Sequence, residues 1–134
     1  MDLTVDGRRV FAGTGGKPLT QDRPLVVLLH GAGMDHTVWV LQARFLAYHG
    51  FSVLAVDMPG HGRSEGPPLT TIEAMADWVA KVVVVSGFDK AALVGHSMGA
   101  AVALTAAARS PDRIAKIALL GASLAMPEIG RAHV

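Results

Sequence analysis

One short segment of the chain has the residue types and spacing for nucleophilic chemistry. It matches the pattern G-x-S-x-G, in which a sharp turn between a strand and a helix exposes a serine hydroxyl. Side chains two residues before or after that serine would collide with the strand and the helix, so both places require glycine. The positive end of the following helix would favour negative charge developing on a substrate. The pattern predicts Ser97 as a catalytic nucleophile within Gly95-His96-Ser97-Met98-Gly99.

A second segment has the composition of an anion-binding loop. Its residues are small, so a backbone N–H can point into a crevice beside the nucleophile. Together with the N–H of the residue after the serine, it would form an oxyanion hole, and we expect the two donors to be the amides of Ala32 and Met98. His30 and His96 are expected to be held in hydrogen bonds with the backbone. The segment reads His30-Gly31-Ala32-Gly33.

Both segments have a simpler interpretation. G-x-S-x-G can arise by chance in a chain rich in glycine and alanine, and a glycine-rich connection between a strand and a helix can contact nothing. The context favours the functional interpretation, because each segment follows an apolar run that is typical of a buried strand and precedes a helical pattern. In parallel sheets, ligands bind at the carboxyl ends of the strands, where both segments would lie.

The elements that must position these segments follow from hydrophobic periodicity. Apolar runs predict buried strands over 25–30, 52–57, 91–94 and 114–120, and a hairpin is expected around Asp6-Gly7. Helical spacing predicts three helices. The first covers 36–49, the second runs from a capping box at Thr70 and Glu73 to Gly87, and the third covers 98–109. The alternation predicts an α/β fold: a mostly parallel open sheet with helices on both faces and an amino-terminal β-hairpin.

Composition narrows the classes of function. The 134 residues are 51% hydrophobic and 17% charged, which suits a single domain with a buried sheet. The net charge of +1, without a dense basic run, argues against nucleic acid as a partner. No cysteine is present, so disulfides and thiolate metal sites are excluded. No apolar stretch predicts a membrane span and the start does not resemble a signal peptide, so a cytoplasmic location is expected.

Taken together, the segments resemble the α/β-hydrolase superfamily in its serine-nucleophile branch. The resemblance runs from about Pro24 to Leu120 and includes a third segment, Asp57-Met58-Pro59-Gly60-His61-Gly62-Arg63-Ser64. It implies acyl-enzyme chemistry on an ester, lactone or related small-molecule substrate, with no cofactor and no metal. A histidine would act as base and an acid would orient it. Members similar to haloalkane dehalogenases and epoxide hydrolases have aspartate where this chain has Ser97.

The rest of the triad has no convincing candidate. The resemblance places the acid and the histidine after later strands, but Glu128 and His133 are separated by only four residues, without an element to return them to the crevice. His61 could reach the rim of the pocket, whereas His36 and His49 are expected on helix surfaces. Asp57 occupies a place that the family uses for loop structure.

We therefore expect residues 1–127 to be a partial domain, truncated after the strand that follows the nucleophile helix and inactive by itself. Residues 128–134 continue no earlier pattern, and one reverse translation of them resembles a sequencing adaptor, so a non-native tail is expected. Acyl transfer and cofactor-free perhydrolysis are alternatives on the same serine. A non-catalytic binding or receptor protein is the alternative outside enzymes. Substrate size and oligomeric state stay open.

Overall fold

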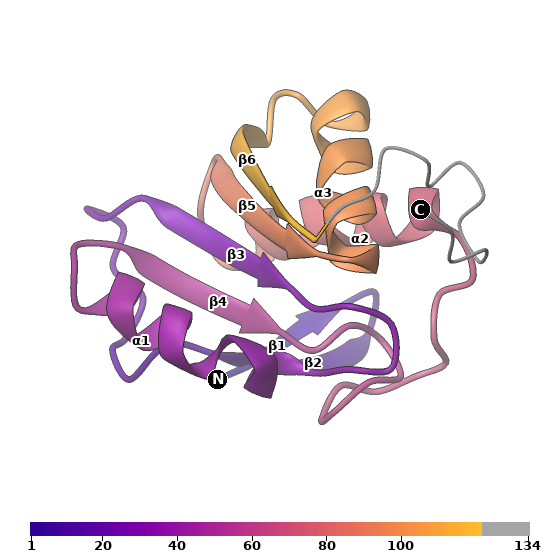
Figure 1. The fold of residues 1–134 in the computed structure, drawn as a ribbon, viewed down its shortest axis with the longest axis horizontal. Coiled ribbons are helices and arrows are strands. Elements are labelled where there is room, and N and C mark those ends of the chain that lie inside the picture. The colour runs from indigo at the N-terminus through magenta and orange to yellow at the C-terminus, as the bar shows by residue number, and fades with distance from the viewer. Residues whose placement is uncertain (122–134) are drawn as a thin grey trace.

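Six strands form a single sheet in the computed structural model, which describes residues 1–121 (Figure 1). The strand order is β1-β2-β4-β3-β5-β6. The inner pairs β4–β3, β3–β5 and β5–β6 are parallel, and β2 joins β4 antiparallel. The four parallel strands are β3 (Leu25–Leu29), β4 (Ser52–Val56), β5 (Ala91–His96) and β6 (Ile114–Leu120).

The amino-terminal hairpin forms as predicted. β1 (Asp2–Val5) and β2 (Arg8–Gly13) pair antiparallel. The two residues between them, Asp6 and Gly7, have φ angles of 53° and 76°. Positive φ at both positions defines the type I′ turn that Asp-Gly favours, and this turn matches the twist of the paired strands.

Helices cover both faces of the sheet. The 3₁₀ helix η1 (His36–Trp39) and α1 (Val40–Ala47) lie on one face, and α2 (Ile72–Val85) and α3 (Met98–Arg109) lie on the other (Figure 1). β4 and β5 flank β3 on opposite sides, so right-handed crossovers place α1 and α2 on opposite faces. Each face has its own apolar core. The predicted fold class is confirmed.

The bounds of three predicted elements were wrong, besides differences of one residue at the ends of β3 and β4. The helix expected over 36–49 begins as one turn of 3₁₀ helix and its α part ends at Ala47. The cap of α2 is Thr71 rather than Thr70, because the Thr71 hydroxyl accepts from the amide of Ala74 at 3.0 Å and Thr71 has extended backbone. The strand expected over 91–94 continues to His96, because β6 pairs with it as far as Leu120.

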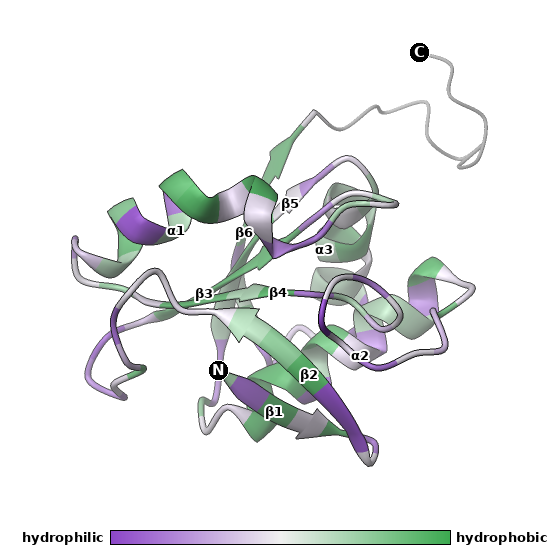
Figure 2. Cartoon of the chain, turned by 90° about the horizontal axis from the view of Figure 1, so that it is seen from below, coloured by the Kyte–Doolittle hydropathy of each residue, from purple (hydrophilic) through white to green (hydrophobic). Residues whose placement is uncertain are grey.

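β6 lies at one edge of the sheet within residues 1–121. About half of its residues are exposed to solvent. The end of the strand, where the grey trace begins, is coloured hydrophobic in Figure 2. Lys116 is the one charged residue of the strand. Among the described residues, none of the helices combines the length and the apolar character that crossing a bilayer requires.

Candidate functional site

Ser97 is the single residue between the end of β5 and the start of α3. Its backbone has φ 57° and ψ −117°, in a region that side-chain-bearing residues rarely adopt. Such a conformation costs about 1–3 kcal/mol and persists only where the surroundings impose it. The side chain is half-buried, at the amino end of α3, where the helix dipole favours negative charge.

The glycines on either side of Ser97 are required by close approach. A Cβ on Gly95 would lie 2.6 Å from the amide nitrogen of Ala100, inside the first turn of α3. A Cβ on Gly99 would lie 2.7 Å from the carbonyl carbon of Leu29 and 2.8 Å from the carbonyl oxygen of His30. Real Cβ atoms essentially never come so close to backbone. The predicted collision with strand and helix is confirmed at both positions.

The loop after β3 lies directly against Ser97, so the fold brings the two predicted segments together. A Cβ on Gly31 would stand 3.3 Å from the Cβ of Ser97 and 3.5 Å from the carbonyl oxygen of His96. Ala32 is exposed and Met98 half-buried. Within residues 1–121, neither amide N–H of these two residues donates to an acceptor. Their role as oxyanion donors stays a prediction.

His30 is fully buried at the end of β3 and bonds only to backbone. Its Nε2 accepts from the amide of Met58 at 3.0 Å, so the proton sits on Nδ1, which donates to the carbonyl oxygen of Gly31 at 2.7 Å. Burial lowers the pKa of His30 below its ordinary value of 6.5. The predicted backbone bonding is confirmed for His30. For the half-buried His96 it stays a prediction.

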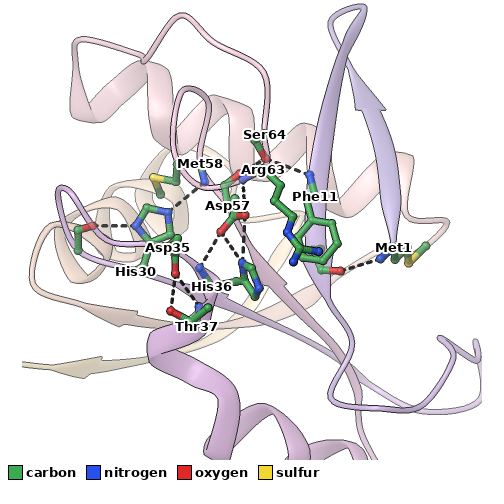
Figure 3. Close-up of polar contacts among 12 residues, drawn as sticks. Met1, Phe11, His30, Asp35, His36, Thr37, Asp57, Met58, Arg63 and Ser64 are labelled. Carbon is green, nitrogen blue, oxygen red and sulfur yellow. Dashed lines mark hydrogen bonds and ion pairs between the residues drawn. The ribbon is translucent and has the colours of Figure 1, made fainter.

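Asp57 is the centre of a polar cluster that the sequence did not reveal (Figure 3). Its carboxylate is fully buried and accepts from the amide of His36 at 2.6 Å, from Nδ1 of His36 at 2.9 Å and from the amide of Arg63 at 2.9 Å. The placement of His36 on a helix surface was therefore wrong. Its ring instead lies between Asp57 and the ring of Phe11, 4.8 Å away between centroids.

His49 and His61 make contacts that do not involve Ser97 within residues 1–121. His49 is exposed, as predicted, with its ring stacked on Phe45 and its Nδ1 donating to the Phe45 carbonyl oxygen at 2.6 Å. His61 is half-buried, with Nδ1 3.1 Å from the carbonyl oxygen of Pro59 and its ring centroid 5.0 Å from that of His30. Glu128, His133 and the whole segment 128–134 lie outside the described residues.

Three side chains come close enough together to be considered as metal ligands. Ligand atoms of Asp35, His36 and Asp57 lie within 4.8 Å of one another. Much of their acceptor capacity is already engaged, because Asp57 accepts three N–H groups and Oδ1 of Asp35 accepts the amide and the hydroxyl of Thr37. These bonds lower the pKa of the Asp35 carboxyl. The donor set suits a hydrogen-bonded cluster better than a metal ion.

Comparison with known proteins identifies the family. The model of the alpha/beta hydrolase fold matches residues 24–133. The chain belongs to the α/β-hydrolase family. The match includes all four parallel strands, the Ser97 turn and the loop that lies against it.

Curated relatives within the family differ in activity. The chain is 40% identical over 119 residues to the dihydrolipoyllysine-residue acetyltransferase component of the acetoin cleaving system of Cupriavidus necator, covering 87% of this chain and 30% of that protein. It is 36% identical over 132 residues to epoxide hydrolase B of Mycobacterium tuberculosis, covering 96% and 36%. It is 42% identical over 105 residues to the pimeloyl-[acyl-carrier protein] methyl ester esterase of Sodalis glossinidius, covering 78% and 38%.

A solved structure with the same arrangement is that of a membrane phospholipase A described as a bacterial virulence factor. Its TM-score with this chain is 0.80 at 31% identity, covering 89% of this chain and 38% of that one. This chain spans about a third of the length of the curated relatives it matches.

Proposed function

We propose that this chain carries the nucleophile and the oxyanion hole of a serine hydrolase that cleaves ester, lactone or related acyl bonds of small molecules. Ser97 Oγ attacks the substrate carbonyl, and the alcohol leaves as the acyl-enzyme forms. The amides of Ala32 and Met98 stabilise the negative charge on the carbonyl oxygen. Water then hydrolyses the acyl-enzyme. The reaction needs no cofactor, and we place the protein in the cytoplasm.

The backbone of Ser97 is the observation that carries this proposal. A serine held at φ 57° between a strand and a helix, beside Gly31 of a second loop, has a backbone conformation that is costly for the fold. Such local strain is typical of catalytic positions. Serine at position 97 also favours acyl chemistry over epoxide hydrolysis. Family members similar to epoxide hydrolases have aspartate at that position.

The base and the acid of the triad are proposed to come from sequence other than residues 1–121. His30 is unsuited as the base because both ring nitrogens are engaged by backbone and its lowered pKa disfavours taking up a proton. His36 has the Nδ1–Asp57 bond of a triad histidine, but within residues 1–121 it makes no hydrogen bond to Ser97, and its ring packs on Phe11. Without a base, Ser97 stays a weak nucleophile, since losing triad members costs about 10⁴–10⁶ in kcat. We therefore expect negligible esterase activity from the 134-residue chain.

Acyl transfer is the second candidate, and the similarity to the acetyltransferase component of the acetoin cleaving system favours it. It uses the same acyl-enzyme at Ser97 but passes the acyl group to an acceptor other than water. Product analysis separates the two: a hydrolase releases the free acid from an activated ester at the same rate whether or not an acceptor alcohol, amine or thiol is added.

The proposal is tested by labelling the longest natural protein that contains this chain with a fluorophosphonate and locating the adduct by mass spectrometry. We expect rapid labelling at Ser97 and none in Ser97→Ala. Ser110→Ala, at the other end of α3, is the matched control and should label like the unmodified protein. A protein that binds an ester analogue but is not labelled at Ser97 would instead be a non-catalytic binding protein, and the proposal would fall.

A further inference from the structure

The loop that carries Ala32 has few contacts of its own. Ala32, Gly33 and Met34 are exposed, and a Cβ on Gly33 would find no atom within 4 Å. Inside the loop, the amide of Met34 donates to the carbonyl oxygen of Gly31 at 3.2 Å. An exposed segment with so little packing cannot hold an amide in place by itself. Its position against Ser97 must be set at its two ends.

The first end is fixed through His30. The ring joins the loop to the segment after β4, because Nδ1 donates to Gly31 at the start of the loop and Nε2 accepts from the amide of Met58. All of these atoms are buried. A buried hydrogen bond of this kind is costly to break, since the amide would lose its partner away from water.

The second end is fixed through His36, which holds the neighbouring residue of the same segment. Two donors of His36, its amide and Nδ1, reach the carboxylate of Asp57 (Figure 3). Asp57 is itself immobilised, because its amide donates to the Phe11 carbonyl oxygen at 2.9 Å and its own carbonyl oxygen accepts from the hydroxyl of Ser64 at 2.6 Å. The acceptor for His36 is therefore anchored to the sheet.

We propose that His36 is a positioning residue for the reaction: with His30 it fastens both ends of the loop to consecutive residues, Asp57 and Met58, and thereby holds the Ala32 amide at Ser97. The inference rests on the proposed function, because Ala32 matters only if an oxyanion forms beside it. It assigns a task to a histidine outside the recognised segments. A misplacement of about 1 Å in such a donor can cost 10²-fold in rate.

The test compares two substitutions of His36 with a matched control. His36→Leu keeps bulk against Phe11 but removes the Nδ1 donor. His36→Asn places an amide nitrogen at the same distance from Cβ and can restore the bond. His49→Leu removes an exposed histidine whose Nδ1 bond stays within its own turn.

The first measurement is hydrogen exchange of the 134-residue chain, followed by mass spectrometry. In His36→Leu we expect at least tenfold faster exchange in the peptide over 31–38, with the α2 peptide over 72–85 unchanged as a measure of global stability. His36→Asn should lie within about twofold of the unmodified chain, and His49→Leu should match it. Equal protection of 31–38 in all four proteins would overturn the proposal.

The second measurement uses the longest natural protein that contains this chain, with an aryl ester as substrate. His36→Leu should lower kcat about tenfold with KM within twofold, and His36→Asn should recover most of it. Unchanged kcat despite faster loop exchange would overturn the positioning role. If the unmodified protein never labels at Ser97 but the loop still loosens in His36→Leu, the proposed function fails, and only the contact of His36 with the loop stands.

Discussion

The two connections that meet at the site are built in opposite ways. Between β5 and α3 a single residue, Ser97, reverses the chain, and the turn is fixed by backbone atoms that leave no room for a Cβ at Gly95 or Gly99. Between β3 and η1 the loop is longer and exposed, and it is fixed by the side chains of His30 and His36. One connection tolerates no added atoms, whereas the other depends on donors and acceptors that can be removed singly.

The largest contrast is expected from the same substitution in both connections. Gly99→Ala should destabilise the chain by about 3 kcal/mol or more, because Cβ would meet the backbone of Leu29 and His30. Gly33→Ala should cost only about 1 kcal/mol, because the space around it is open and the φ of 72° is the sole penalty. Urea unfolding followed by circular dichroism measures both. Equal losses would show that the two connections do not differ in this way.

Removing the buried ring of His30 from the connection between β3 and η1, called here the polar connection, should lower stability by an intermediate amount. His30→Leu leaves the amide of Met58 without its acceptor, in a buried place, and should lower the free energy of unfolding by about 2 kcal/mol. His49→Leu removes an exposed ring and should stay within about 0.5 kcal/mol of the unmodified chain. Chemical denaturation gives both values. A loss as small as that of His49→Leu would mean that water replaces the ring without cost.

The polar connection should also respond to pH. Burial lowers the pKa of His30 in the folded chain, so between about pH 6.5 and that lower value the unfolded chain binds more protons. Stability should therefore fall as the pH decreases through this window, with a slope of at most about 1.4 kcal/mol per pH unit. His30→Gln does not titrate and should show a shallower fall between pH 7.5 and 5.5. An identical fall in thermal midpoint for both proteins would exclude His30 as the cause.

The smallest effect should come from relieving the strain at Ser97. Glycine tolerates φ 57° without the steric penalty that a side chain meets, so Ser97→Gly should be about 1 kcal/mol more stable than Ser97→Ala. Differential scanning calorimetry of the two variants measures the difference, which is independent of catalysis. A less stable Ser97→Gly would show that the turn holds no strain.

Local patterns predicted most of the fold. Apolar runs gave the four parallel strands to within two residues, and the bounds of α3 and β6 were predicted correctly. The errors lie at the ends of elements, such as the carboxyl ends of α1 and β5 and the starts of two helices. Thr70 and Thr71 both have a hydroxyl that can cap a helix, and only the backbone conformation of Thr71 selects it. The first turn of the helix after His36 is 3₁₀, which no local pattern distinguished from α.

The features of the site likewise fall into those that local sequence predicted and those that depend on tertiary contacts. The sequence by itself predicted the Ser97 turn, because the G-x-S-x-G pattern marks it within five consecutive residues, although the backbone that excludes a Cβ at Gly99 belongs to Leu29 and His30 at the end of β3. It also placed Gly31 near the same edge, since parallel strands end together. Only the tertiary structure decided that His36 binds Asp57, 21 residues away, and that Met58 binds His30, 28 residues away. A hydrogen bond between distant side chains depends on how the crossovers stack, and no local spacing encodes that.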